Sequence, residues 1–242
     1  MTSHPHGVIL DLDGTLLTIE RRFYKVFNDT VELTGGRRIS NRDFPKKFHG
    51  NQLYHHPFGP APENAPLTRH FWNIFLKFYG KKTYSRYSTP IKGARHAVAQ
   101  IRRNGTIIAV VTGRICPAGV VRGELRNIGI NQYVDVIVTK ATAPNFTNHH
   151  RATSRDAELH EVLRRLRIGV SRCVFVADYV EDVRSAKSLR ISTIAALSGS
   201  SSLALLRKEK PDHIIESVRD LPDLLESKFG DGCREGSADL SG

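Results

Sequence analysis

Cysteine is scarce in this chain, which holds only three among 242 residues, namely Cys116, Cys173 and Cys233. Their odd number and wide spacing fit neither a disulfide framework nor a zinc site, and they indicate a reducing compartment. No apolar stretch approaches the roughly 20 residues that a membrane-spanning helix needs. The N-terminus also lacks the charged and then apolar pattern of a secretion signal. These absences exclude a disulfide-rich secreted domain and a membrane protein, so we expect a cytoplasmic protein.

Acidic residues are outnumbered, with 24 Asp and Glu against 36 Lys and Arg and a formal net charge of +12. The excess lies in residues 19–92, where 14 Lys and Arg face 5 Asp and Glu. This segment is either a basic solvated surface or a module that attracts anions, because net charge concerns partners rather than fold. The length suits one large domain or a domain with a smaller insert. The composition, 40% hydrophobic and 25% charged, is that of a soluble protein.

The most informative segment is residues 7–16, where a short apolar run ends in Asp11 and Asp13, followed by Gly14 and Thr15. The run predicts a buried strand that stops at a turn. Because side chains alternate between the two faces of a strand, both carboxylates point the same way at its carboxyl end. Two like charges so close together need compensation. A divalent cation bound by both carboxylates is one such compensation. A proton on one of them is another, as when a nucleophile stands beside a proton donor.

Two other interpretations of this motif compete with a catalytic one. Asp13 and Gly14 also favour a plain turn. A calcium loop that begins at Asp11 would need Gly at its sixth position and an acid at its twelfth. Those positions hold Leu16 and Arg22, which excludes the calcium loop. The choice between a turn and a functional site depends on the rest of the chain.

From residue 91 onward, segments of helical spacing alternate with short apolar runs. This alternation is typical of parallel strands joined by helices that cover both faces of the sheet. The fold expected is therefore a doubly wound α/β sheet whose first strand is the apolar run before Asp11. The predicted helices are 93–103, 117–128, 156–167, 181–189 and 200–206, and the predicted strands are 107–111, 134–138, 173–177, 191–196 and 212–215.

Residues 18–90 break this rhythm and predict a small helical insert, with helices at 20–34 and 67–79 around an irregular stretch rich in proline. Five aromatic residues of the second helix are interpreted as the insert's own packing: Phe71, Trp72, Phe75, Phe78 and Tyr79. Residues 229–242 lack periodicity and predict a flexible tail. The predicted division is a core of residues 1–17 and 91–228, the insert at 18–90 and the tail.

Polar residues stand at four predicted strand ends: Asp11 with Asp13, Thr112, Thr139 with Lys140, and Asp178 with Asp182. Ligands of an open parallel sheet bind outside the carboxyl ends of its strands, near the point where the strand order reverses. These groups are therefore predicted around one crevice. Phosphoryl transfer uses such a set, namely an attacking carboxylate, a second acid that moves protons, and Mg²⁺ on oxygen ligands. A hydroxyl and a cation can hold the remaining phosphate oxygens.

With these strand ends, the motif Asp11-Leu12-Asp13-Gly14-Thr15 resembles the haloacid dehalogenase-like (HAD) superfamily, in particular the phosphoglycolate phosphatase-type phosphohydrolases. The resemblance covers residues 7–16 and 91–225. It implies a Rossmann-like core with a small helical cap inserted after the first strand. The second Asp of the motif favours phosphatases, because dehalogenase members lack it.

The resemblance also implies roles for individual residues. Asp11 falls on the nucleophile and Asp13 on the general acid/base, whose backbone carbonyl also binds Mg²⁺. Thr112 falls on the hydroxyl donor to the phosphate. Asp178 falls on a metal ligand, and Asp182 on an additional ligand or a residue that supports one. The predicted metal set is thus Asp11, Asp13, Asp178 and Asp182, although Ala177 stands where the family usually has Gly.

The family's lysine has no obvious counterpart here. It usually precedes a helix and is followed by Pro, and alignment on the helix at 156–167 puts Thr153 in its place. We assign the role to Lys140, which directly follows a strand, although a solvated Lys at a strand end is the competing interpretation. The cationic alternatives are Arg151 and Arg155.

The insert at 18–90 stands where the family has its cap, which closes over the site and selects the substrate. A basic cap would suit a small anionic phosphoester, and its candidate contacts are Arg21, Arg22, Lys46 and Lys47. Nearby His residues lack metal-binding spacing and are expected at the surface: His49, His55 and His56.

The function expected is a Mg²⁺-dependent phosphatase that hydrolyses a small, phosphoglycolate-like phosphomonoester through an aspartyl-phosphate. One alternative is a phosphomutase of the β-phosphoglucomutase type, which passes the phosphoryl group on. Another is a basic nucleic-acid-binding protein or a phosphatase of nucleic-acid ends, because the isoelectric point is near 9.9. No nucleic-acid motif is present, so the partner expected is the small substrate, without membrane or nucleic acid, and the chain is a monomer or homodimer.

Overall fold

The strands of the described residues form one sheet of six parallel strands in the order β3-β2-β1-β4-β5-β6. The computed structural model describes residues 5–143 and 154–229. The strands span Gly7–Asp11 (β1), Ile107–Thr112 (β2), Val136–Thr139 (β3), Cys173–Ala177 (β4), Ser192–Ala196 (β5) and His213–Ile215 (β6). This confirms the doubly wound α/β sheet expected from the alternation in sequence. The order reverses between β1 and β4, so their carboxyl ends flank the place where such sheets bind ligands.

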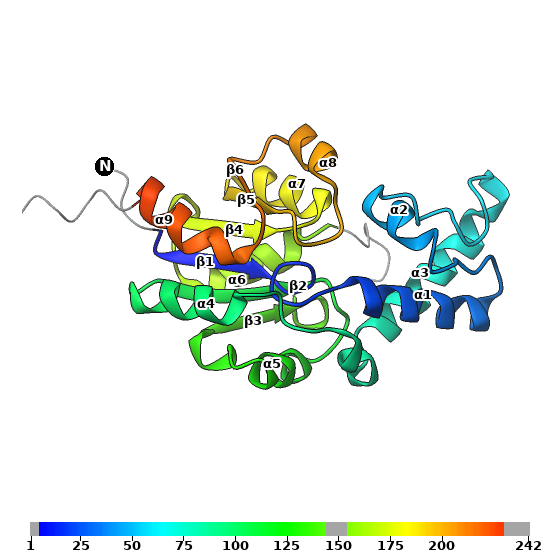
Figure 1. Cartoon of the computed structure of the whole chain (residues 1–242), viewed down its shortest axis with the longest axis horizontal. Coiled ribbons are helices and arrows are strands. Elements are labelled where there is room, and N and C mark those ends of the chain that lie inside the picture. The colour runs from blue at the N-terminus through cyan, green and yellow to red at the C-terminus, as the bar shows by residue number, and fades with distance from the viewer. Residues whose placement is uncertain (1–4, 144–153, 230–242) are drawn as a thin grey trace, which may run out of the picture.

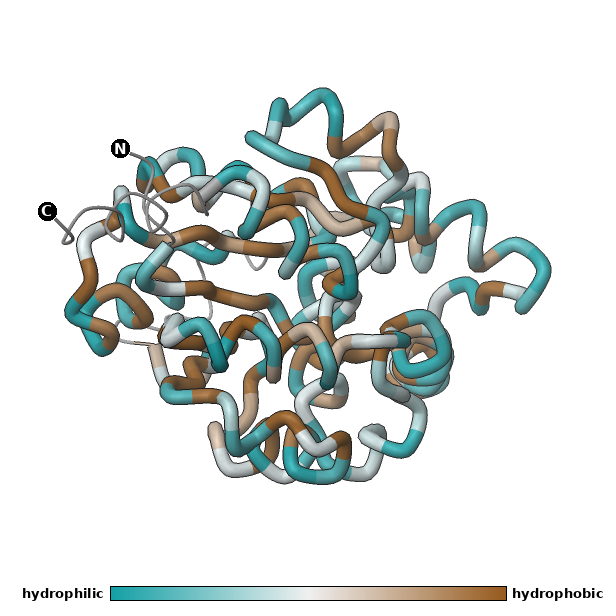
Figure 2. Tube along the Cα trace, turned by 60° about the vertical axis from the view of Figure 1, so that its left-hand side comes forward, coloured by the Kyte–Doolittle hydropathy of each residue, from teal (hydrophilic) through white to brown (hydrophobic). Residues whose placement is uncertain are grey.

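Helices cover both faces of the sheet, as Figure 1 shows. On one face lie α4 (Ala94–Arg103), α5 (Ala118–Asn127) and α9 (Leu221–Phe229), which pack on alternate residues of β1 such as Val8 and Leu10. On the other lie α6 (Asp156–Leu166), α7 (Val180–Ser188) and α8 (Leu203–Lys208), and α6 and α7 pack on Ile9 and Phe175. Each central strand is thus buried on both sides, and Figure 2 shows hydrophobic residues running along the strands.

A helical lobe lies beyond the carboxyl ends of the strands (Figure 1). It consists of α1 (Glu20–Thr34), α2 (Phe44–His49) and α3 (Ala65–Tyr79), inserted between β1 and β2. It has its own core, and the aromatic stripe of α3 contributes Phe71, Phe75 and Tyr79 to it, as the sequence predicted.

Two chain crossings join the lobe to the sheet, and they are tied to each other. The Thr18 amide donates to the Thr89 carbonyl at 2.7 Å, and the two hydroxyls lie 3.0 Å apart. The lobe also reaches the core elsewhere. The His49 carbonyl accepts from the Ser202 amide at 3.3 Å, and the Asn51 side chain accepts from the Tyr179 hydroxyl at 3.4 Å. These contacts hold the lobe against loops that follow β4 and β5.

The observed bounds match the predicted elements within a few residues, with two omissions. The sequence analysis did not predict α2, which is six residues long and has Pro45 in its first turn, or α9, whose Leu221 and Leu225 are buried. The predicted tail begins at Phe229, the last residue of α9, and its other residues lie outside the described ones. No helix in residues 5–143 or 154–229 is long and apolar enough to cross a membrane.

Candidate active site

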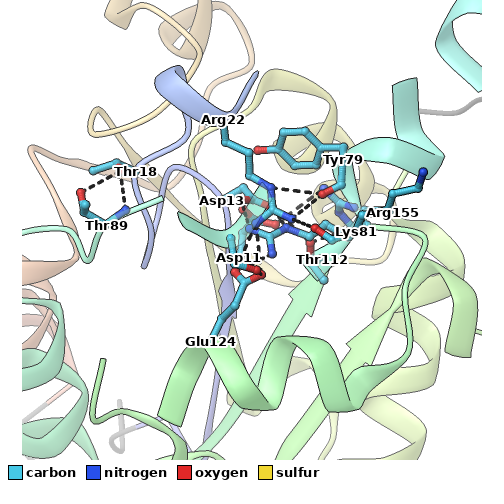
Figure 3. A network of polar contacts seen from close by, with 12 residues as sticks. Asp11, Asp13, Thr18, Arg22, Tyr79, Lys81, Thr89, Thr112, Glu124 and Arg155 are labelled. Carbon is cyan, nitrogen blue, oxygen red and sulfur yellow. Dashed lines mark hydrogen bonds and ion pairs between the residues drawn. The ribbon is translucent and has the colours of Figure 1, made fainter. Parts of the chain in front are cut away.

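The register of the sheet brings the predicted strand-end residues to one edge. Asp11 pairs with Val111, and Thr112 with Thr139, while Asp178 directly follows β4. The side chains of Asp11, Thr112 and Asp178 are each nearly fully buried. Parallel strands in register end at the same edge of the sheet. The position of these groups at the strand ends therefore predicted that they lie close together. Figure 3 shows Asp11, Asp13 and Thr112 gathered there with Arg155 and residues of the lobe.

Asp11 is the carboxylate at the centre of this edge. Burial raises its pKa well above the ordinary value, and the neighbouring carboxylates of Asp182, Asp178 and Asp13 add to the rise. Only Arg155 opposes them strongly, because its Nη2 lies 3.6 Å from Asp11 Oδ1. A buried carboxylate among like charges needs a further cation to stay ionised at neutral pH.

Arg155 is the residue that supplies a cation to Asp11. It is the N-cap residue of α6, and its Nη2 donates to Asp182 Oδ2 at 3.0 Å. Its backbone amide donates to the Ser185 hydroxyl at 3.0 Å, which fixes where the side chain starts. Gly113 makes room for the guanidinium, because a Cβ at that position would overlap Arg155 Nη1. Burial opposes its charge, but the surrounding carboxylates raise its pKa, so Arg155 stays cationic.

The sequence assigns this role to Lys140, with Arg151 and Arg155 as the alternatives. Lys140 begins the short 3₁₀ turn η4 (Lys140–Thr142) and is buried. Burial and the charge of Arg155 lower its pKa, although Glu158 and Asp182 work against this, so it lies near the same cluster. Arg151 falls outside the described residues. The catalytic assignment of Lys140 stays a prediction, and the described ion pair to Asp11 is made by Arg155.

Asp13 is held by Arg114, which the sequence analysis did not single out. Arg114 Nε donates to Asp13 Oδ2 at 2.7 Å and its Nη2 donates to Oδ1. Thr112 Oγ1 lies 3.4 Å from Oδ2 on the other side. Burial alone would raise the pKa of Asp13, but Arg114 and Arg22 together lower it. Asp13 is therefore a carboxylate with a fixed plane, whereas Asp11 two residues earlier is pushed toward protonation.

Asp178 lies against the backbone of two loops. Its Oδ2 accepts from the Ser200 amide at 2.5 Å and from the Ser200 hydroxyl at 2.9 Å. Burial raises its pKa to about 7, although these hydrogen bonds lower it in part. Gly14, with a φ of 87°, and Gly199 come so close that a Cβ on either would overlap Asp178 atoms. The glycine of the Asp13-Gly14-Thr15 turn therefore serves the approach of Asp178 to β1.

We expect Gly14→Ala to displace Asp178 and to lower activity at least tenfold, besides the cost of about 1–2 kcal/mol for a Cβ at positive φ. Gly105→Ala is the matched control, because Gly105 has a φ of 77° and a Cβ added to it would meet nothing within 4 Å. Urea unfolding and phosphate release would be measured on both variants. Similar losses of activity in both would show that strain alone, without contact to Asp178, explains the effect.

A divalent metal fits the residues present. Burial and mutual repulsion raise the pKa values of Asp11 and Asp178, and a cation between them would relieve both. Asp182 Oδ1 is buried and has no partner among the described residues. Both carboxylate oxygens of Asp13 face Arg114, so its backbone carbonyl is the group it offers a metal. In residues 5–143 and 154–229, no three Asp, Glu, His or Cys side chains form a complete site by themselves. Mg²⁺ commonly completes such partial sets with water and substrate oxygens.

Of the four basic lobe residues proposed from sequence, one is joined to this site. Arg22 is fully buried and faces Glu124 of α5, whereas Arg21 and Lys46 are exposed and Lys47 is half-buried. The sequence analysis missed Glu124, because a Glu within a helix gives no sign of a buried partner elsewhere. His49 pairs with Glu20 at 3.0 Å.

The fold and the site together define a doubly wound α/β enzyme with a carboxylate-centred site under a helical lobe. The model of the haloacid dehalogenase-like hydrolases matches residues 8–196, and the chain belongs to this family. The family match therefore confirms the resemblance seen in the motif at Asp11, and the protein is a haloacid dehalogenase-like hydrolase.

Relatives are similar over nearly the full length. A protein provisionally named pyrophosphatase PpaX, from Caldanaerobacter subterraneus subsp. tengcongensis, is 27% identical and covers 95% of this chain and 96% of its own. A phosphoglycolate phosphatase of Nitrosococcus oceani is 22% identical over 93% of this chain and 98% of its own. A crystal structure described as that of a "predicted phosphatase" from Clostridium acetobutylicum superposes with a TM-score of 0.73 at 16% identity, covering 93% and 100% of the two chains. That structural likeness confirms the fold.

Proposed function

We propose that this protein is a Mg²⁺-dependent phosphatase that hydrolyses a small phosphomonoester through an aspartyl-phosphate on Asp11. The observation that carries the proposal is the contrast between two carboxylates two residues apart. Asp11 lies at the strand end beside Arg155, with an oxygen 3.6 Å from the guanidinium. Asp13 is fixed by Arg114 on both oxygens. One carboxylate is placed to attack and the other to move a proton.

The proposed reaction has two steps. Asp13 is held ionised by Arg114 in the free site, so it takes up a proton from solvent as the anionic substrate binds. An oxygen of Asp11 then attacks the phosphorus, and the bond to the leaving oxygen breaks as Asp13 gives that oxygen its proton. Asp13, now a carboxylate, takes a proton from the water that hydrolyses the aspartyl-phosphate and restores Asp11. Arg155 neutralises charge on the phosphate oxygens, because its cationic form is favoured by the carboxylates around it. Thr112 offers a hydroxyl near Asp13.

We assign the metal to Asp11, Asp178 and the backbone carbonyl of Asp13. Bound there, Mg²⁺ would draw negative charge from the phosphate and permit approach of the Asp11 carboxylate. Asp182 was also predicted as a ligand. Its hydrogen bond to Arg155 at 3.0 Å supports a different contribution, in which Asp182 orients Arg155 and leaves one oxygen for water or metal.

We propose further that residues 18–90 act as the cap of this site. The lobe lies beyond the carboxyl ends of the strands and contacts the core at Ser202, Tyr179 and Glu124. Its excess of positive charge suits a small anionic substrate. The names of the relatives point to phosphoglycolate and pyrophosphate as compounds to test. A cytoplasmic location and a monomeric or dimeric state stay predictions.

The proposal is tested by phosphate release from a panel with and without Mg²⁺. The panel holds phosphoglycolate, pyrophosphate, sugar phosphates and a 5′-phosphorylated oligonucleotide. We expect release from small compounds only, lost on removal of Mg²⁺ by chelation and restored when Mg²⁺ is added back. No release from any phosphoester, or equal release without a divalent metal, would contradict the proposal. Preference for the oligonucleotide would favour a phosphatase of nucleic-acid ends.

A further inference from the structure

Four charges of alternating sign, three of them buried and Asp13 partly exposed, run from the site into the lobe. Asp13 is paired with Arg114, and Arg114 Nη1 donates to Glu124 Oε2 at 2.7 Å. On its other side, Glu124 accepts from Arg22 Nη1 at 3.1 and 3.3 Å. The row therefore reads Asp13, Arg114, Glu124, Arg22, with two negative and two positive charges. Figure 3 shows Arg22, Glu124 and Asp13 in this cluster.

Burial makes each member of this row depend on its neighbours. The side chains of Arg22 and Arg114 are 0% and 1% exposed, and that of Glu124 is 7% exposed. Burial alone would raise the pKa of Glu124, but the two guanidinium groups lower it, so it is ionised. A charge taken out of water is tolerated only when it is paired and hydrogen-bonded. Loss of one member therefore leaves a neighbour without its counter-charge.

The outer end of the row is fixed to the lobe. Arg22 belongs to α1, and its Nε donates to the Tyr79 carbonyl, at the end of α3, at 3.1 Å. The ring of Tyr79 lies 4.9 Å from the Arg22 guanidinium carbon and 5.6 Å from that of Arg114. Ser85, in the chain that returns to the core, donates to Glu124 Oε1. Glu124 thus receives two donors from the lobe and one from the core.

We propose that Arg22 and Glu124 are positioning residues that hold Arg114 against Asp13, so that docking of the lobe and orientation of the acid–base carboxylate form one event. This inference rests on the proposed function of Asp13. When the lobe is docked, the Glu124 carboxylate accepts hydrogen bonds from Arg22 and from Arg114 at the same time, and the second of these holds Arg114 in place. When the lobe moves away, Glu124 loses Arg22 and draws Arg114 toward itself, which leaves Asp13 without a fixed plane.

The leaving group of the substrate distinguishes positioning from general support of the fold. An alkyl phosphate needs a proton on its leaving oxygen, whereas p-nitrophenolate leaves without one. A variant that misplaces Asp13 therefore loses kcat/KM on β-glycerol phosphate and retains most of it on p-nitrophenyl phosphate. A variant that is merely less folded loses activity on both esters equally.

The experiment compares Arg22→Met, Glu124→Gln and the double variant with the parent. Each single variant leaves the row with one charge in excess of the opposite sign, and we expect a lower melting temperature. The double variant removes one charge of each sign and should melt close to the parent. We expect its kcat/KM on β-glycerol phosphate to stay about thirtyfold below the parent, and on p-nitrophenyl phosphate within about threefold, since acid catalysis contributes 10²–10⁴-fold. Arg164→Met removes an arginine that is 71% exposed and serves as the matched control.

A readout without catalysis completes the test. Hydrogen exchange in peptides covering residues 79–87 should speed up in the double variant, because the Tyr79 carbonyl loses its donor Arg22 of α1 and Ser85 loses the carboxylate of Glu124 in α5. If kcat/KM on both esters returns to the parental value in the double variant, together with the melting temperature, the proposal is overturned. Arg22 and Glu124 would then form an ion pair that only stabilises the fold. An increase of KM for both esters at unchanged kcat would also overturn the proposal and make Arg22 a substrate-binding residue. The proposed function is tested by a different variant. Full activity in Asp11→Asn would contradict that function whatever the double variant shows.

Discussion

Asp11→Asn should abolish phosphate release, with a loss of roughly 10⁴-fold or more, as is typical when a nucleophile is removed. The amide cannot attack phosphorus, and no aspartyl-phosphate can form. Asn keeps the size of the side chain, so the sheet register with Val111 is preserved. The measurement is phosphate release from the best substrate of the panel, with acid-quenched labelling of the protein by a ³²P-labelled substrate. Parent protein should carry a short-lived label and the variant none.

The control is Asp223→Asn, which removes an exposed carboxylate from α9. It should release phosphate at the parental rate. Label that persists in the parent without release of inorganic phosphate, and that passes to an added sugar phosphate, would favour the phosphomutase alternative. Undiminished activity in Asp11→Asn would refute the assignment of the nucleophile.

The same variant should be more stable than the parent when metal is absent. Because burial and neighbouring carboxylates raise the pKa of Asp11 in the folded protein, the folded state binds more protons than the unfolded state above the ordinary value of 3.8. The contribution of Asp11 to the free energy of unfolding therefore falls as the pH rises from 3.8 toward the raised pKa of the folded state. The advantage of the variant should grow as the pH rises above about 4, and Mg²⁺ should reduce it. Higher stability with lost activity is expected where a site stores unfavourable charge.

Much of the site follows from where apolar runs end. Asp11, Asp13, Thr112 and Asp178 each stand at or just beyond the end of a strand, and parallel strands in register bring such ends together. The pattern could not show what each group touches. Asp13 and Asp11 are equivalent in sequence, and only Arg114 on one and the cluster of carboxylates around the other make their charges differ.

Contacts between distant segments were beyond prediction. Glu124 looks like any helical Glu, and its partners Arg22 and Arg114 are 102 and 10 residues away. The excess of positive charge in residues 19–92 identified the lobe as unusual but not which of its cations turn inward. Asp178 depends in the same way on Ser200 and Gly199, which lie in a loop whose sequence carries no distinctive motif.

The cation opposite Asp11 is the clearest case. Alignment on α6 placed Thr153 at the family's lysine, and the strand end favoured Lys140. Arg155, one of the two cationic alternatives, is the residue whose guanidinium lies 3.6 Å from Asp11. Gly113 is needed as well, because any side chain there would occupy the space of the guanidinium. A single sequence shows neither the contact nor the space.

Arg155→Met should therefore lower kcat about 10²- to 10³-fold, the effect of removing one preorganised donor from a site where charge develops. Met retains an unbranched apolar stem but neither the charge nor the hydrogen bond to Asp182. Arg155→Lys should recover part of the loss, since it keeps the charge but not the two-sided contact to Asp11 and Asp182. Binding of orthovanadate, measured by inhibition and by calorimetry, should weaken in the same order.

Lys140→Met decides between the two cations, because Lys140 is buried near Glu158 and Asp182, which also act on Arg155, but its pKa is lowered rather than raised. If Arg155 is the phosphate-binding cation, Lys140→Met lowers kcat less than Arg155→Met does and leaves vanadate binding nearly unchanged. The reverse order would return the role to Lys140 and make Arg155 a counter-ion for Asp182. Arg164→Met is the control for the loss of an arginine from α6, and it should change neither kcat nor vanadate binding. The charge that the family places on a lysine would then reach the nucleophile from a different position of the chain, by a longer side chain that passes over a glycine.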